Sequence, residues 1–240
     1  PSAASDVYKR QGLDGKVHEE VLTLTITGPI EYSLADFPEP FVLDSVLNTT
    51  FVVGASANHT HTGWRASTGD VVGSVMISSR LGLEATAMMV NVVEDMTIAT
   101  CSSWEVSINW SMIKTRTVIV VGGPGVNYLV LYYNKTLPFS WIYKPPTKSV
   151  IYSNVTGNEY KAGGVKYDYA VIALIKDPDT GKHVLIVWGL QRYGTQAACM
   201  LLQNYDKYDL SGVAMIIKWT DNGNKKVDEG DVIEIIERWP

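Results

Sequence analysis

The stretch TVIVVGGPGVNYLVLYY (Thr117–Tyr133) places an apolar run, a glycine-rich turn and a second apolar segment in direct succession. The first run is short and rich in β-branched residues, which predicts a buried strand, and the second predicts a helix. Nucleotide-binding folds open with this order of strand, glycine turn and helix. The turn therefore either holds a phosphate or serves only to let the backbone bend.

The residues of the turn argue against a phosphate. A dinucleotide turn needs three glycines at fixed offsets, and Gly123 and Gly125 supply two, but Tyr128 stands where the third belongs. Pro124 removes a backbone N–H that could have faced a phosphate. No Gly-Lys-Ser/Thr follows, so the phosphate loop of NTPases is excluded as well. The glycines are therefore interpreted as small residues that permit a tight turn from strand to helix.

The same unit of strand, glycine, loop and helix recurs on both sides of this stretch. It appears as Phe51–Gly54 before a helix expected over Asp70–Gly82, and as Val184–Gly189 before a helix capped by Thr195. Parallel strands joined by crossover helices would produce such a repeat. The sequence thus predicts an α/β fold with a mixed, mostly parallel sheet built from these units. Added β-hairpins are also expected, one of them through the turn Asp177–Lys182.

The domain organisation follows from these units. Residues 1–11 share no pattern with the rest and are predicted to be a foreign or disordered leader, and the chain is expected to be a fragment without its export signal or anchor. An N-terminal α/β half with a leading strand is expected over 12–107. A C-terminal half is expected over 108–212, with a surface insertion at 140–164. A strand–loop–strand or strand–loop–helix element is expected over 213–240.

The composition of the chain limits which partners and which cellular compartment it fits. A net charge of −5 without long charge runs gives no footprint for nucleic acid, and no apolar run is long enough to span a membrane. An exported, N-glycosylated protein is predicted from five glycan acceptor motifs, which begin at Asn48, Asn58, Asn109, Asn134 and Asn154. The two cysteines, Cys101 and Cys199, fit either one disulfide or two buried thiols.

Two segments have some metal-binding character. Thr220–Asp231 resembles a calcium loop, and its oxygen donors at the third, fifth, ninth and twelfth positions are Asn222, Asn224, Asp228 and Asp231. Because Lys225 replaces the glycine of such a loop, an Asn-Gly turn with an acidic flank is the favoured alternative. His59 and His61 supply half of a zinc site, but no third ligand is fixed by the sequence, so a solvated loop is favoured there.

Hydrolytic machinery is not visible in the sequence. The chain contains no Gly-x-Ser-x-Gly elbow, no His-Glu-x-x-His helix and no cysteine within a catalytic signature. The Asp and Glu residues are scattered along the chain, and scatter does not define a site. We therefore expect a protein that is not an enzyme and that needs no cofactor other than calcium at the loop described above.

Four pieces of the sequence, in this order, resemble surface-layer proteins of the methanogen and Thermococcus type. These pieces are Phe37–Val42, then Val52–Ala57 with Asp70–Gly82, then Val118–Asn127, and finally Tyr169–Gly189 with Thr195–Leu201. The similarity spans most of residues 30 to 210. It implies a fragment that covers the N- and C-terminal α/β regions of that archaeal family.

The resemblance implies a non-enzymatic subunit of an extracellular lattice, which assembles with copies of itself and is glycosylated and associated with divalent cations. The alternative from the residues is an extracellular module that binds a small ligand or carbohydrate. Its site would lie where the loops after Gly54, Gly123 and Gly189 converge. Gln191, Arg192 and Tyr193 are the polar groups expected there.

Overall fold

The computed structural model describes residues 3–11, 17–25, 31–144 and 149–240. The chain divides into two compact units, Pro1–Glu31 and Tyr32–Pro240. In the first unit, β1 (Ala3–Gln11) pairs antiparallel with β2 (Val17–Thr25). Residues 3–11, which the sequence assigned to a foreign or disordered leader, are thus a strand, and residues 1–2 lie outside the described residues.

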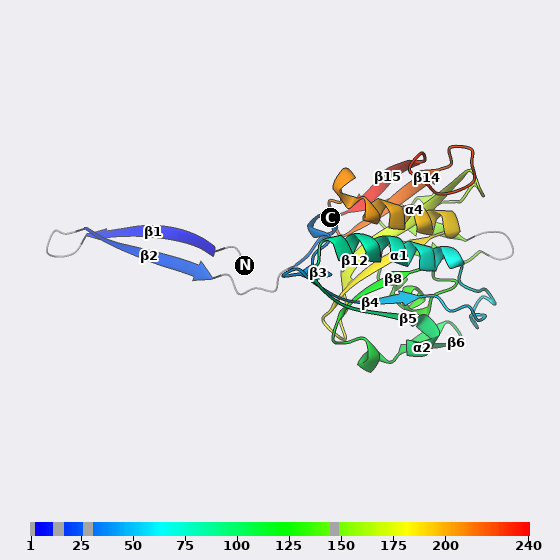
Figure 1. The fold of residues 1–240 in the computed structure, drawn as a ribbon, viewed down its shortest axis with the longest axis horizontal. Helices are drawn as coiled ribbons and strands as arrows, with labels where there is room; N and C mark the ends of the chain where they lie inside the picture. Colours follow the sequence, from blue (N-terminus) through cyan, green and yellow to red (C-terminus); the bar gives the residue numbers. More distant parts are fainter. Residues whose placement is uncertain (1–2, 12–16, 26–30, 145–148) are drawn as a thin grey trace. The chain divides into compact units, whose positions relative to one another are not determined.

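The second unit is built on one mixed sheet (Figure 1). Its strands are β3 (Val42–Leu43), β4 (Val46–Val53), β5 (Ala87–Glu94), β8 (Thr117–Val121), β12 (Tyr167–Lys176), β13 (His183–Gly189), β14 (Ala214–Thr220) and β15 (Val232–Trp239). The order across the sheet is β15-β14-β12-β13-β8-β4, with both β3 and β5 paired to β4. The run β5, β4, β8 and β13 is parallel, whereas β12, β14 and β15 pair antiparallel.

Two helices cover one face of this sheet and lie side by side in Figure 1: α1 (Thr68–Leu83) and α4 (Arg192–Gln203). Their buried residues share one core with alternate strand residues such as Ile119 and Leu185. Small residues let the two helices approach, because a Cβ on Gly73 would lie 2.6 Å from Cys199 Sγ.

Smaller elements cover the opposite face, where Val120 and Ile186 belong to a second core. They are α2 (Asp95–Ile98), α3 (Tyr128–Tyr133), a hairpin of β6 (Ala99–Ser102) and β7 (Glu105–Ile108), and a small sheet of β9 (Phe139–Ile142), β10 (Val150–Ser153) and β11 (Glu159–Tyr160). Short 3₁₀ turns occur at Leu34–Asp36, Trp110–Met112 and Tyr205–Lys207.

The prediction of an α/β fold made of repeated strand–glycine–loop–helix units is wrong, because the chain is mostly β. The three predicted strands do lie in parallel as β4, β8 and β13. However, the helix after β8 has only six residues and packs on the other face from α1 and α4. Half of the sheet is antiparallel, since short connections such as Asp177–Lys182 can join only antiparallel neighbours.

The predicted insertion at 140–164 is not merely surface, since Trp141 and Ile151 belong to the second core and Val150 is buried as well. The terminal element at 213–240 is a strand–loop–strand pair, β14 and β15. The helix expected from Asp70 begins at Thr68, because Ser67 caps α1 and Asp70 completes a capping box. The cap predicted at Thr195 is wrong, since α4 begins at Arg192 after Gln191.

Candidate functional site

The carboxyl ends of three parallel strands meet at a small cavity. Strands β4, β8 and β13 end at Val53, Val121 and Gly189, and the loops that follow them converge, as parallel strands require. The cavity has a volume of about 160 Å³. It is lined by Trp64, Arg65, Ser67, Asp70, Gly123, Pro124, Gly125, Val126, Trp141, Gly189, Leu190, Gln191, Arg192 and Thr195.

The cavity contains a buried carboxyl group on α1. Asp70 is 3% exposed, and its Oδ2 accepts a hydrogen bond of 3.1 Å from the Ser67 backbone N–H. Burial raises the pKa of Asp70 to about 6, because the charged form loses its hydration, and the bond from Ser67 opposes this only in part. Asp70 is therefore a protonated donor at acidic pH and a carboxylate acceptor above neutrality.

The start of α4 supplies one basic side chain and one amide side chain to the cavity, and Arg65 supplies a second basic group. Gln191 and Arg192 line it, as the sequence predicted for the binding-module alternative. Tyr193 does not, since its ring stacks against Trp219 at 5.1 Å between centroids. Arg192 Nη2 donates to the Tyr193 hydroxyl over 2.7 Å, which holds the guanidinium at the rim.

Two tryptophans form the apolar wall, and the glycine turn makes room for them. A Cβ on Gly125 would lie 2.7 Å from the Trp64 ring and 3.6 Å from Trp141. The small residue at 125 therefore permits an aromatic side chain, not a phosphate, to pack on the turn. No ligand is needed to explain Gly125.

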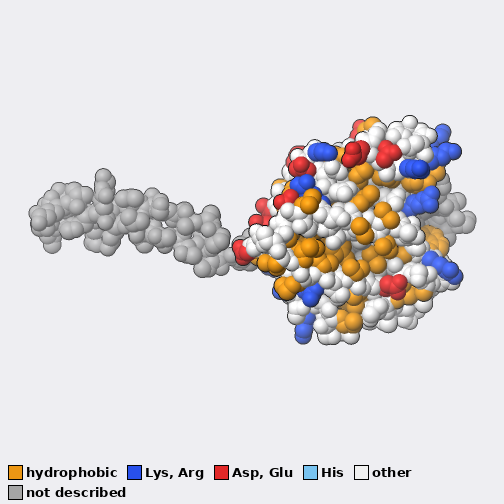
Figure 2. Space-filling model, viewed as in Figure 1, with side chains coloured by type: hydrophobic (Ala, Val, Ile, Leu, Met, Phe, Trp, Pro, Cys, Tyr) orange, Lys and Arg blue, Asp and Glu red, His pale blue; other side chains and the backbone are white. Residues whose placement is uncertain are grey.

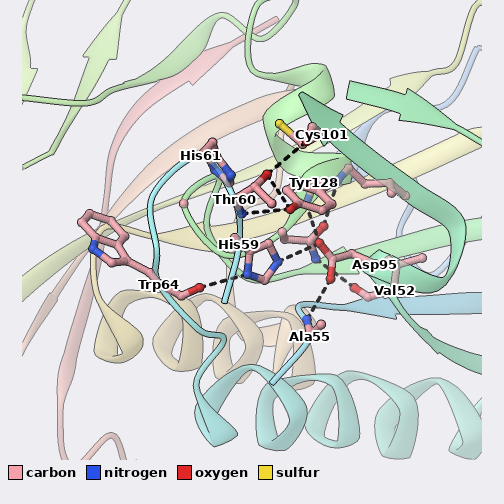
Figure 3. A network of polar contacts seen from close by, with 12 residues as sticks. Val52, Ala55, His59, Thr60, His61, Trp64, Asp95, Cys101 and Tyr128 are labelled. Atoms are coloured by element: carbon pink, nitrogen blue, oxygen red, sulfur yellow. Dashed lines mark hydrogen bonds and ion pairs between the residues drawn. The ribbon is translucent and has the colours of Figure 1, made fainter. Parts of the chain in front are cut away.

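A buried polar network holds the β4–α1 loop beside this turn (Figure 3). Its centre is Asp95, a fully buried residue at the start of α2. Asp95 Oδ1 accepts from the Ala55 backbone N–H at 2.8 Å, and Oδ2 accepts from the Tyr128 backbone N–H at 2.7 Å. His59 Nε2 lies 2.9 Å from the same Oδ2. One carboxylate thus ties the loop after β4 to the first residue of α3.

The remaining contacts of the network reinforce this link. The Tyr128 hydroxyl accepts from the Thr60 backbone N–H over 3.1 Å, and Thr60 Oγ1 donates to the Cys101 carbonyl over 3.0 Å. Thr62 Oγ1 donates to the Gly125 carbonyl over 2.7 Å. The backbone around the cavity is therefore fixed by side chains from separate parts of the chain.

The two histidines serve this network and are not joined by a third metal ligand. His59 is fully buried against Asp95, whereas His61 Nε2 lies 2.9 Å from the Pro124 carbonyl oxygen. Burial lowers the pKa of His61. The described residues contain no group of three His, Cys, Asp or Glu side chains that could hold a metal ion. The expectation of a solvated loop is wrong for His59.

The predicted calcium-loop residues do come together after β14. Asn222 and Asn224 donate their side-chain amides to Asp228, over 3.1 and 2.5 Å. Asp231 accepts from the Trp219 ring N–H at 2.7 Å and from two backbone N–H groups. These bonds explain how the loop is closed between β14 and β15, and calcium binding there stays a prediction.

The five glycan acceptor asparagines differ in how free they are. Asn58 and Asn109 are exposed, and each uses its Oδ1 as an acceptor, from Arg65 and Ser111 respectively. The amide nitrogens of Asn134 and Asn154 instead donate to the Trp141 and Leu137 carbonyls. Asn48 is half-buried within β4. Because a glycan is attached to the amide nitrogen, Asn58 and Asn109 are the best placed of the five.

The two cysteines are free thiols that lie on opposite faces of the sheet. Cys199 of α4 is buried in the core that α1 and α4 form with the sheet, and Cys101 packs against the core on the other side. Burial raises the pKa of both thiols. The structure therefore favours two separate thiols over the disulfide that the sequence left open.

Comparison with protein-family models and with curated proteins finds no match for this chain. Among the described helices, none is long and apolar enough to cross a membrane. The sequence pointed to the converging loops and to Gln191 and Arg192. It did not single out Asp95 or Trp141, because the contacts that give them roles join distant parts of the chain.

Proposed function

We propose that this chain is a structural, non-enzymatic subunit of an extracellular protein lattice, as the resemblance to archaeal surface-layer proteins implies. One observation supports it best: an apolar face formed by the edge strand β5 and helix α1. Among the described strands, β5 pairs with β4 alone, so its outer backbone groups are open to another strand.

The side chains of this face are apolar and exposed. Met88 and Val92, which lie on the α1 side of β5, are 56% and 60% exposed. A hollow of about 430 Å³ lies between Met88 and Val92 of β5 and Val71 and Val75 of α1. Figure 2 shows hydrophobic side chains gathered over the α1 region of this view. Exposed apolar patches of this kind mark protein interfaces.

The occupant that fits this face is a second copy of the chain. Glu94 is the one charged residue of β5, at its last position. An antiparallel β5–β5 pairing that sets residue 87 opposite residue 94 would place Glu94 against Ala87, so no like charges meet. A two-fold contact of this type closes on itself, and a lattice needs further contacts. Strand β15, at the other end of the described sheet, offers an open edge for one of them.

The test is assembly in solution and in two dimensions. We expect the wild-type second unit, residues 32–240, and the whole chain to form dimers and larger assemblies in sedimentation velocity and electron microscopy. Val92→Lys should weaken dimerisation by more than about tenfold in the dissociation constant, because it buries a charge at the centre of the contact.

The matched control is Val165→Lys, which changes an exposed valine in a loop outside the β5–α1 face. It should leave assembly unchanged. A wild-type chain that stays monomeric, with and without millimolar calcium, would count against the lattice proposal, and so would equal effects of the two lysine variants.

The alternative, a ligand-binding module, is favoured by the cavity at the ends of β4, β8 and β13. A ligand with hydroxyl groups there would donate to the Asp70 carboxylate, whose pKa of about 6 lies above its ordinary value. Sugars or nucleotides that bind should therefore raise the melting temperature at pH 8 more than at pH 5. Loss of this difference in Asp70→Asn is expected, and a screen without any shift at pH 8 contradicts the alternative.

A further inference from the structure

A row of aromatic rings lies beside the cavity and extends beyond it. Tyr143 is at its centre, with its ring centroid 5.6 Å from that of Trp64, 5.6 Å from that of Trp104 and 5.5 Å from that of Trp141. Trp64 and Trp104 are 44% and 42% exposed, whereas Trp141 is nearly buried. Two large rings are thus presented to solvent on a rigid aromatic base.

Trp104 is presented by a strained backbone. It is the second of two residues that join β6 to β7, and Ser103 and Trp104 have φ values of 51° and 70°. A two-residue hairpin turn with both central residues at positive φ strongly favours glycine, above all at its second position. A bulky residue held there costs on the order of 1–3 kcal/mol, and such strain is concentrated at binding sites. The turn therefore keeps an indole where glycine would be more stable.

A second cavity, of about 530 Å³, lies against this row. Trp104, Trp141 and Tyr143 supply its aromatic surface, and the exposed side chains Glu105 and Lys135 are its charged residues. The Asn134 side chain holds the backbone of Trp141 in place. Its Oδ1 accepts from the Trp141 backbone N–H over 2.6 Å, and its amide nitrogen donates to the Trp141 carbonyl over 3.0 Å. The site is largely aromatic and preformed, and its lining includes one acceptor group, Glu105, and one donor group of opposite charge, Lys135.

We propose that this aromatic site binds a neutral saccharide, with a pyranose ring stacked on Trp104. The C–H face of a pyranose is apolar and matches an exposed indole, while its equatorial hydroxyls project to the sides, where Glu105 can accept and Lys135 can donate hydrogen bonds. The opposite charges of these two residues balance, so the site does not select an anion or a cation. A pocket of mostly aromatic lining with a few polar groups is the usual form of a small-molecule site.

The saccharide site is independent of the lattice contact. The residues that line it and those of the β5–α1 face do not overlap. Either proposal can therefore fail while the other stands, and different variants test them.

The decisive variant is Trp104→Gly, because it separates stability from binding. Glycine relaxes the positive-φ turn, so the melting temperature should stay the same or rise. Saccharide binding should weaken by more than about tenfold, as is typical when a central tryptophan is removed. If Trp104 served packing alone, the same change would lower the melting temperature.

The measurement is isothermal titration calorimetry with cellotriose, maltotriose, mannotriose and chitotriose, and with tetramethylammonium as the probe for a cation. We expect at least one trisaccharide to bind wild-type protein, with binding lost in Trp104→Gly and kept in Trp239→Ala, an exposed tryptophan of β15. The proposal is overturned if none of the four sugars binds at millimolar concentration, if only tetramethylammonium binds, or if Trp104→Gly binds as the wild type does.

Discussion

Asp95→Ala is expected to lower the free energy of unfolding by about 3 to 5 kcal/mol, because it removes the shared acceptor of several buried hydrogen-bonding groups. The carboxylate is fully buried and accepts from the Ala55 and Tyr128 backbone N–H groups and faces His59 Nε2. Alanine would leave these groups without partners and without water, and each unsatisfied buried group costs about 1–3 kcal/mol.

Urea unfolding of the wild type and the variants, followed by circular dichroism, measures this loss. Asp95→Asn keeps one acceptor oxygen and should be intermediate. Asp209→Ala is the matched control, since the Asp209 side chain is 70% exposed in its ion pair with Arg238 and its loss should change stability by less than about 0.5 kcal/mol. A loss below about 1 kcal/mol for Asp95→Ala would show that the network does not hold the loops around the cavity.

The apolar patterns of the sequence identified the central strands of the main sheet but not their directions, and they missed the small sheet of β9, β10 and β11. Val118–Val121 and Val184–Val187 were identified as buried strands and do pair in parallel. Strand β12 has the same buried pattern, and its antiparallel direction relative to β13 could be predicted only from the hairpin turn at Asp177–Lys182. A strand buried on both faces shows the same composition whichever way it runs. The direction of a strand depends on the connection that leads to it. The prediction of repeated crossover helices was wrong for the unit after β8, because α3 is only six residues long.

Some residues of the candidate site could be predicted from their neighbours in the sequence, whereas others depend on contacts between distant segments. Gln191 and Arg192 could be placed at the cavity because they directly follow a predicted strand. Asp95 could not, since its partner His59 is 36 residues away and the bond forms only when α2 packs beside the loop. Trp104 was equally hidden, because neither its positive φ nor its position beside Tyr143 leaves a mark in the sequence pattern.

Gly189→Ala is expected to destabilise the protein by about 3 kcal/mol, at the upper end for overpacking. A Cβ at 189 would lie 2.3 Å from the Thr195 backbone nitrogen and 2.8 Å from the Gln191 carbonyl oxygen. Both are backbone atoms of the turn into α4, so no flexible side chain can move aside. The Gly189 N–H also donates to Thr195 Oγ1 over 2.9 Å, a bond that the displaced turn would lose.

Gly123→Ala is the matched control, because Gly123 lies in the glycine-rich turn that could either bind a phosphate or only let the backbone bend. A Cβ at 123 would meet one atom within 4 Å, the Gly189 carbonyl oxygen at 3.2 Å, which a small shift can relieve. Gly123→Ala should therefore cost less than about 1 kcal/mol by urea unfolding, well below Gly189→Ala. Glycine at 189 would then be required by close approach of the backbone. Equal losses in the two variants would contradict this steric explanation, and so would a Gly123→Ala protein that folds normally but loses affinity for a nucleotide.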